Sequence, residues 1–372
     1  MARPGRKAFL YMDVYEQLRQ SITAGELKPE EKLMSEEDMA LKYHVSRITV
    51  KKALELLKDD GYIDRVQGRG TFVRPPQDHA PASADAPRPQ RKTIGFVLEH
   101  VASPFGLDML YQTDQLLRQA GYTLLIRFSY GSVEKETEEI EALLSMGIQA
   151  LITMPCHNSY YNMGILKLIL EQFPVVLVDK RMYGLPVPSV CTDGEEAICR
   201  LVEHLHERGC RNAALITIDP SSTTSLTDRV NGFYDGLKKT GMSSAGECVL
   251  PKRSENLLQA SLQDTDYTAR INDFLDSFEQ LPDAFVLTEF ALSRLLNLIA
   301  VQRGLRAGKD FKACGIDEDY HSPWGFLFTH MKQDENAIAQ HVVDILLKRL
   351  AGEEVTPEAV RVPALFRQGQ TT

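Results

Sequence analysis

The chain has 372 residues, a formal net charge of −9 and a hydrophobic content of 43%. This length suits two or three domains, and the hydrophobic content is ample for buried cores, which excludes a largely disordered protein. No apolar run reaches the roughly 18 residues of a membrane span, and the N-terminal stretch has no apolar segment of signal-peptide length. We therefore expect a cytoplasmic protein without a membrane partner.

The six cysteines are scattered along the chain and form no C-x-x-C pair. No cluster of histidines lies near any of them in the sequence, so a zinc site is not expected. The cytoplasm keeps such thiols reduced, and we expect free, buried cysteines. The sequence indicates neither a metal site nor a cofactor.

Before residue 75 the sequence predicts three helices and a hairpin. Apolar residues recur at helical spacing between Tyr11 and Ile22, and Ser35 opens the second helix with Asp38 at the capping-box position. The third helix begins at Ser46, and its apolar face is formed by Val50, Ala53, Leu54 and Leu57. After a glycine that ends this helix, the stretches "YIDRV" and "TFVRP" flank "QGRG" as a short hairpin.

The opposite face of the third helix is basic. It carries Arg47, Lys51, Lys52 and Lys58, although residues 1–78 as a whole hold 14 Lys/Arg and 13 Asp/Glu and are nearly neutral. A basic helix followed by a hairpin predicts a winged helix-turn-helix whose third helix enters the major groove of DNA. The residues expected to contact DNA are Ser35, Ser46, Arg47, Thr49, Lys51, Lys52, Gln67, Gly68 and Arg69. The alternative is an ordinary solvated helix face.

The stretch "GELKPEEKLMSEEDMALKYHVSRITVKKALELLKDDGYIDRVQGRGTFV" resembles the GntR family of bacterial regulators. The resemblance lies in the Ser-Glu of the second helix, the Val-Ser-Arg-x-Thr-Val turn into the third helix and the Gly-x-Gly-Thr-Phe-Val of the hairpin. It implies that residues 1–74 form a DNA-binding domain.

Residues 75–91, "PPQDHAPASADAPRPQR", contain five prolines and show no aliphatic periodicity. Such a composition is typical of an extended linker, which spans up to about 3.1 Å per residue. The alternative is a long ordered loop inside a single domain, which is uncommon in compact domains.

After the linker, apolar strand-like stretches alternate with helical ones. The predicted strands include "TIGFVLEH", "YTLLIRF", "IQALITMP", "VVLVD", "AALITI", "DAFVLTE" and "KACGID". This alternation predicts an α/β fold with parallel sheets that helices cover. Ligands of such sheets bind beyond the carboxyl ends of the strands, so the residues that follow each strand are candidate ligand contacts.

Residues 92–365 resemble the effector domain of the lac repressor family, which is similar to periplasmic sugar-binding proteins. The resemblance rests on "SPFGLDMLYQTDQLLRQAGYTLLI", "VVLVDKR", "CTDGEEAICRLVEHLHERGCRNAALI", "DRVNGFYDGLKK" and "FLFTHMKQDENAIAQHVVDILLKRL", in this order. It implies that residues 92–372 form a two-lobed, periplasmic-binding-protein-like domain with parallel sheets. This domain is expected to bind an effector between its lobes and to form a dimer.

Proteins hold sugars through Asp, Glu, Arg, Asn and Gln side chains and through aromatic surfaces. By position in the resemblance, the expected effector-binding residues are Phe105, Asp179, Arg229, Asp317 and Gln333. Further candidates that follow apolar strands are Glu99, His157, Arg181 and Glu289. In the alternative, the charged side chains form plain surface ion pairs, Asp179 with Arg181 and Asp228 with Arg229, and His157 has a structural role.

A GntR-type head joined to this body is similar to repressors of arabinose use. We therefore expect a homodimeric transcription repressor that binds operator DNA and is released by a small carbohydrate, with arabinose as the first candidate. The main alternative is a sugar-binding or sugar-processing enzyme domain fused to a DNA-binding head. The sequence contains no G-x-S-x-G, H-E-x-x-H or P-loop motif, which argues against an enzyme.

Overall fold

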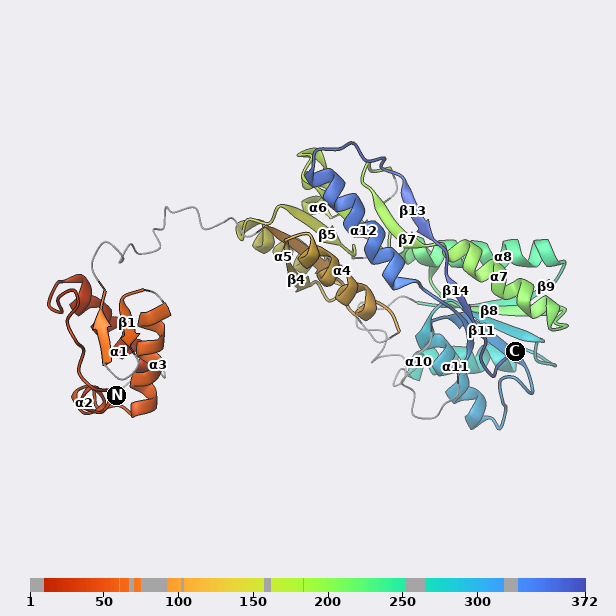
Figure 1. The fold of residues 1–372 in the computed structure, drawn as a ribbon. Coiled ribbons are helices and arrows are strands. Elements are labelled where there is room, and N and C mark those ends of the chain that lie inside the picture. Colours follow the sequence, from red (N-terminus) through yellow and green to blue (C-terminus); the bar gives the residue numbers. More distant parts are fainter. Residues whose placement is uncertain are drawn as a thin grey trace, which may run out of the picture. The chain divides into compact units, whose positions relative to one another are not determined.

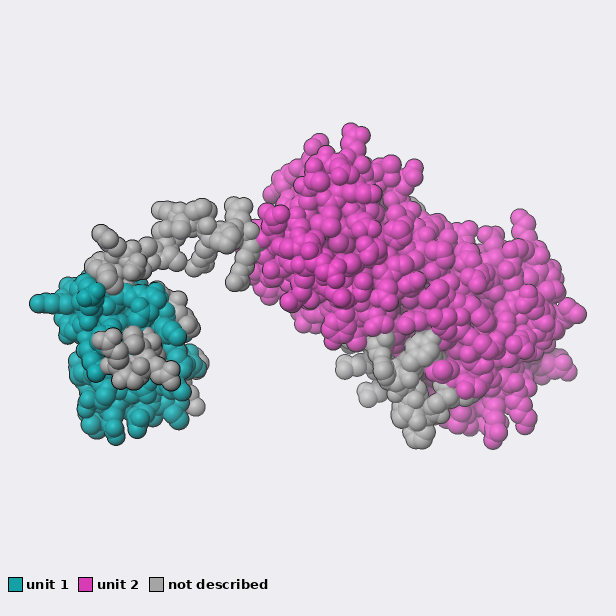
Figure 2. Space-filling view, in the orientation of Figure 1, with its two compact units in different colours: residues 1–90 teal, residues 91–372 magenta. Residues whose placement is uncertain are grey.

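The computed structural model describes residues 10–59, 61–66, 70–74, 92–101, 104–156, 162–182, 184–251, 265–317 and 327–372. The chain divides into two compact units, Met1–Gln90 and Arg91–Thr372 (Figure 2). The predicted linker, residues 75–91, lies outside the described ranges. Its extended form and the domain limits drawn from it stay predictions.

The first unit is a winged helix-turn-helix, as the sequence predicts. Its elements in chain order are α1 (Leu10–Thr23), α2 (Glu36–Lys42), α3 (Arg47–Asp59), β1 (Ile63–Val66) and β2 (Gly70–Val73), and the two strands pair antiparallel (Figure 1). Buried apolar residues of all three helices, among them Leu18, Met39 and Leu54, pack together. Ser35 accepts a hydrogen bond from the Asp38 amide at 3.2 Å, which confirms the predicted cap of α2.

The chain before α2 supports the hairpin. The Leu33 amide donates to the Thr71 carbonyl at 2.8 Å, so this segment runs along β2. Gly70 has a φ of +120°, and a Cβ at this position would lie 2.6 Å from Cε of Lys32. The start of β2 therefore requires a glycine.

The first lobe of the second unit is built on a six-stranded parallel sheet of order β13-β7-β6-β5-β3-β4 (Figure 1). Its strands are β3 (Thr93–Leu98), β4 (Thr123–Phe128), β5 (Ala150–Thr153), β6 (Val175–Val178), β7 (Ser189–Thr192) and β13 (Ala359–Val362). Its helices are α4 (Leu107–Gln119), α5 (Val133–Ser145), α6 (Met163–Leu170) and α12 (Glu335–Leu350).

The second lobe has a six-stranded sheet of order β14-β12-β11-β10-β8-β9, in which β14 runs antiparallel to β12. Its strands are β8 (Asn212–Ile218), β9 (Ser243–Leu250), β10 (Ala284–Leu287), β11 (Lys312–Ile316), β12 (Thr329–Lys332) and β14 (Leu365–Arg367). Its helices are α7 (Gly194–Glu207), the short η1 (Pro220–Ser222), α8 (Thr224–Thr240), α10 (Thr265–Asp276) and α11 (Phe290–Gln302).

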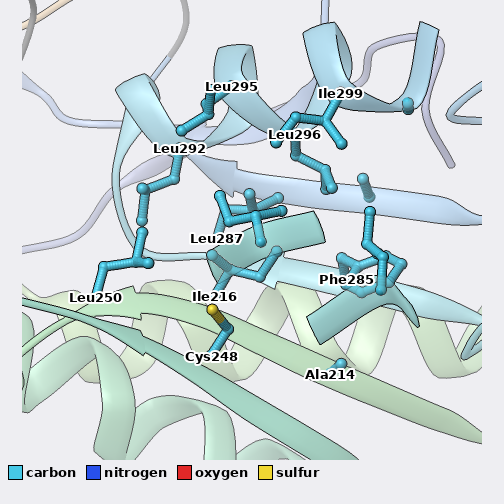
Figure 3. Close-up of a cluster of buried hydrophobic side chains, with 14 of the residues drawn as sticks. Ala214, Ile216, Cys248, Leu250, Phe285, Leu287, Leu292, Leu295, Leu296 and Ile299 are labelled. Carbon is cyan, nitrogen blue, oxygen red and sulfur yellow. The ribbon is translucent and has the colours of Figure 1, made fainter. Parts of the chain in front are cut away.

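Apolar side chains fill both faces of the second sheet, as expected for parallel strands under helices. On one face, Leu292, Leu295 and Leu296 of α11 lie over Leu287 of β10 and Ile216 of β8 (Figure 3). On the other face, buried residues of α7 and α8 form a separate cluster with the same sheet. Packing on both faces therefore holds the strands of this sheet in place.

The chain passes between the lobes after β7, after β12 and after β13. The two sheets otherwise repeat the same order, so β6 and β11 occupy equivalent places in their lobes. Each lies next to a strand that leads into a crossover. This topology brings the ends of β6 and β11 to the junction between the lobes.

All six cysteines are free, as predicted. Burial raises the pKa of Cys191 and Cys248 to about 11, so both are protonated thiols at neutral pH. Within the described ranges, no helix combines the length and apolar character needed to cross a bilayer.

Candidate functional site

The third helix starts one residue later than predicted, because Ser46 is its cap. The Ser46 hydroxyl accepts from the Thr49 amide at 3.2 Å and lies 2.8 Å from the Thr49 hydroxyl. Arg47 and Lys51 are exposed, and the Lys52 ammonium lies 4.3 Å from the centre of the Tyr11 ring on α1. The face that the sequence predicts to be basic is thus open to solvent, with Lys52 held against α1.

Ile48 is a surface feature of α3 that the sequence analysis missed. Its side chain is 80% exposed in the first turn of the helix, next to Arg47. The sequence does place Ile48 outside the apolar face of α3, which would have predicted an exposed side chain. The predicted contacts Gln67, Gly68 and Arg69 lie outside the described residues.

Asp179 and Asp317 follow β6 and β11, the equivalent strands of the two lobes. Their φ angles are +68° and +59°, in the left-handed region that residues other than glycine seldom adopt. Each is tied to the neighbouring strand, since the Asp179 amide donates to the Val190 carbonyl at 2.9 Å and that of Asp317 to Met331 at 3.0 Å. Such strain tends to occur at functional sites.

Asp317 and Gln333 form a buried pair at the crossover after β12. The two oxygens of Asp317 accept from the Gln333 backbone amide at 3.0 Å and from its side-chain amide at 2.7 Å. The Gln333 side-chain oxygen accepts from the Thr192 hydroxyl of the first lobe at 2.6 Å. Burial raises the pKa of Asp317 to about 7, although both hydrogen bonds oppose this rise.

Arg229 of α8 lies next to this pair. It is 6% exposed and donates to Glu289 Oε1 at 2.6 Å. Burial raises the pKa of Glu289, and Arg229 opposes the rise. Asp179 and Lys180 of the first lobe also influence this pKa, so Glu289 faces the end of β6 across the junction.

The first lobe contributes a buried ion pair between Lys180 and Glu99. The Lys180 ammonium also donates to the Pro155 carbonyl at 3.2 Å. The sequence analysis named Glu99 but missed Lys180. Only the position of Lys180 directly after Asp179 indicated a place at the site. Phe105 is partly buried against the core of the first lobe. The predicted His157 lies outside the described residues.

Arg181 and Asp228 join the two lobes. One guanidinium nitrogen of Arg181 lies 2.6 Å from both carboxylate oxygens of Asp228 on α8. The Arg181 amide donates to the Thr224 hydroxyl at 2.9 Å. The alternative ion pairs expected from the sequence were therefore wrong: Arg181 pairs with Asp228 instead of Asp179, and Arg229 with Glu289. The Arg181–Asp228 pair is buried, and in the second pair Arg229 is buried whereas Glu289 is 34% exposed, because α8 packs at the junction.

Two family models match the chain. That of the bacterial regulatory proteins of the gntR family matches residues 10–73. The model described as periplasmic binding proteins and sugar binding domain of the LacI family matches residues 91–291, which is more than half of the chain. The chain belongs to this LacI-type family. It carries a GntR-type head, as the resemblance implied.

Curated relatives of this LacI-type chain are transcription regulators. An arabinose metabolism transcriptional repressor of Geobacillus stearothermophilus is 28% identical over 312 residues, which cover 83% of this chain and 82% of the relative. The regulator PtxS of Pseudomonas aeruginosa is 24% identical over 290 residues, 76% of this chain and 79% of the relative. These relatives support a regulator and give no support to the enzyme alternative.

Solved structures of LacI-type regulators have the same two-lobed fold. The Cra regulator of Pseudomonas putida, in complex with fructose 1-phosphate, superposes with a TM-score of 0.61 at 21% identity, covering 75% of this chain and 99% of that chain. A LacI regulator of Alkaliphilus metalliredigens, complexed with D-xylulofuranose, gives 0.62 at 20% identity, covering 76% and 99%. The predicted fold class is confirmed.

Proposed function

We propose that the protein is a transcription repressor that binds operator DNA through α3 and the hairpin and leaves the operator when a small carbohydrate binds between its lobes. Arg47 and Lys51 would contact phosphates and base edges, and Ile48 would meet a thymine methyl group. A regulator that acts on DNA would work in the cytoplasm. The comparisons support the class of regulator, and the residue roles are our own assignment.

The observation that carries the sugar site is the pair of aspartates at equivalent strand ends. Asp179 and Asp317 both hold strained backbone conformations at the lobe junction. Arg229 and Gln333 add buried donors beside Asp317. Carboxylate oxygens and amide or guanidinium donors together match the vicinal hydroxyls of a sugar, which both donate and accept hydrogen bonds.

Sugar binding would act on the contacts that join the lobes. Thr192 with Gln333 and Arg181 with Asp228 link the two lobes next to the proposed ligand residues. A sugar that contacts both lobes would favour one arrangement of these links over another. To reverse a 99:1 population, it needs about 5.5 kcal/mol of differential binding between the two arrangements.

The repressor would act as a homodimer, because one recognition helix contacts only half of a two-fold operator. Tyr111 on α4 and Val301 on α11 are more than 60% exposed and are candidate contacts between subunits. Analytical ultracentrifugation of the full chain at micromolar concentration should give a dimer. A monomer that still binds a two-fold operator would contradict this part of the proposal.

Arabinose is the first candidate effector, because a relative named for arabinose metabolism matches 83% of the chain. A thermal-shift assay with L-arabinose and other pentoses tests this, since a ligand at a hundred times its Kd adds about 2.7 kcal/mol to stability. The sugar that raises Tm should also release the protein from an operator duplex selected from random DNA. A sugar that raises Tm without weakening operator binding would contradict the proposed function.

A further inference from the structure

The cations at the lobe junction are bound by the protein's own carboxylates. The pairs are Lys180 with Glu99, Arg181 with Asp228, and Arg229 with Glu289; the first two are buried on both sides, whereas Glu289 is 34% exposed. The side chains of all three cations are at most 15% exposed, so water screens the first two pairs weakly and reaches the third only on the side of Glu289. In the described part of the junction, Arg361 is likewise engaged, by Asp193 and Glu195.

The helix N-terminus beside this site is also occupied. Backbone amides at the start of a helix are a common binding site for phosphate or carboxylate groups. At the start of α4, Glu335 accepts from the Gly106 amide at 2.7 Å and from the Met109 amide at 2.9 Å. Glu335 is 3% exposed and also raises the pKa of Asp317, so this helix end adjoins the proposed sugar residues.

Two further carboxylates, Asp317 after β11 and Glu136 in the first turn of α5, form no ion pair with a described residue. Asp317 accepts only amide hydrogen bonds from Gln333, and Glu136 accepts from the Cys156 amide at 2.8 Å and the Asn162 side chain at 2.7 Å. Carboxylates therefore outnumber cations in the described part of the junction. An added anion would therefore lie close to carboxyl groups, and the three cations Lys180, Arg181 and Arg229 are already paired.

We propose that the site selects an uncharged sugar and rejects sugar phosphates and sugar acids. This inference rests on the proposed function and names the chemical class of its effector. The fold alone does not decide this class, because the two solved structures described above hold a sugar phosphate and an uncharged sugar. An anionic group that binds Lys180, Arg181 or Arg229 has to take the cation from its partner and leave a carboxylate unpaired, which lowers affinity by roughly a hundredfold or more where that carboxylate is buried.

Calorimetry of the full chain with matched ligands tests the inference. The pairs are L-arabinose with L-arabinonate, D-ribose with D-ribose 5-phosphate, and D-fructose with D-fructose 1-phosphate, and each is also added to the complex with operator DNA. We expect the uncharged member to bind at least about a hundredfold more tightly and to be the one that releases DNA. Tighter binding and release by a charged member overturns this inference and leaves the proposed function intact. Binding of no member of any pair overturns both.

The variant Glu289→Gln identifies the discriminating contact. It removes the carboxylate that holds Arg229 while keeping the shape of the side chain, so the preference for the uncharged sugar should fall by about tenfold or more. The matched control is Glu203→Gln, whose carboxylate pairs with the exposed Lys239 on the surface of the second lobe. The control should keep the wild-type preference. An unchanged preference in Glu289→Gln overturns the role assigned to this pair.

Discussion

Asp317 is the residue in which backbone strain, burial and charge coincide. Its φ is positive, its side chain is 5% exposed, and burial raises its pKa to about 7. Glu335 adds to this rise, whereas Arg229 and the two hydrogen bonds from Gln333 oppose it. The protein therefore holds an aspartate that is close to half-protonated at neutral pH, next to the proposed sugar.

This raised pKa makes stability depend on pH in a definite direction. The pKa of the group is about 4 in an unfolded chain and about 7 in the folded protein, so folding favours the protonated form. The contribution of Asp317 to stability is fully present below about pH 4 and is lost as pH rises to about 7. The side chain of the variant Asp317→Asn does not titrate, so the variant does not lose this stability as pH rises. Between about pH 5 and 8, the Tm of the variant measured by calorimetry should rise relative to that of the wild type as pH rises. A Tm difference that does not change with pH would contradict the raised pKa.

Replacement of Arg229 or Asp317 by alanine should separate sugar response from operator binding. Either change leaves sugar hydroxyls without a partner in a buried site, which weakens sugar binding by about 1 to 3 kcal/mol or more. Both variants should bind operator normally yet stay bound when sugar is added. Arg200→Ala, which removes an exposed arginine of α7, is the matched control. Calorimetry measures sugar binding and gel-shift assays measure operator binding on the same preparations. Wild-type sugar affinity in both variants would show that the sugar binds at another site.

At the residue scale, the sequence located candidate positions but not their partners. Asp179 and Asp317 were found from their positions in the resemblance, each at the end of a predicted strand. The pairing of Arg181 with Asp228 was not found, because these residues are 47 positions apart and meet only through the crossover between lobes. Ion-pair partners depend on tertiary packing, which local sequence patterns do not encode.

At the scale of single elements, α3 carries the proposed DNA contacts. Arg47→Ala should weaken operator binding by about 1 to 3 kcal/mol and reduce the salt dependence by about one phosphate contact. Lys239→Ala removes an exposed cation in the second unit and serves as the control. Fluorescence anisotropy at several salt concentrations measures both effects. Operator affinity that does not change in Arg47→Ala would contradict the role assigned to α3.

The packing of α7 against α8 depends on glycine. A Cβ on Gly232 of α8 would lie 2.2 Å from the Glu195 carbonyl oxygen of α7. Gly232→Ala should therefore destabilise the second unit by about 1 to 3 kcal/mol, although alanine normally stabilises a helix. Gly241→Ala is not a suitable control because of the positive φ at that position. Ser225→Ala in the first turn of α8 is a better one, and a Tm in Gly232→Ala equal to that of the control would contradict the close contact.

Element prediction succeeded for strands with a continuous apolar sequence, including the edge strand β4, and missed strands of mixed composition. The stretches "VVLV" of β6 and "AFVL" of β10 are buried along their whole length, so their continuous apolar sequence identified them. The edge strand β9 is mostly exposed over its first residues, "SSAGE", and this mixed sequence gave no strand signal. The order of strands also escaped prediction, because pairing joins segments that are distant in the sequence.

At the scale of the whole molecule, a DNA-binding head and a two-lobed body share one chain. The links between the lobes lie beside the residues proposed to bind sugar, so on this proposal a bound sugar acts directly on the arrangement of the lobes. The uncharged character of the proposed effector follows from the same residues, since their cations are already paired. A ligand that binds both arrangements equally would shift nothing, however tightly it binds.

The most direct test of this account is fluorescence anisotropy of a labelled operator duplex titrated with the full chain, without sugar and with saturating L-arabinose or another uncharged sugar identified by thermal shift. We expect tight binding without sugar and a loss of affinity of about a hundredfold or more with it, because the sugar favours an arrangement that does not fit the operator. Operator affinity that stays the same when a bound sugar saturates the protein would contradict the central claim.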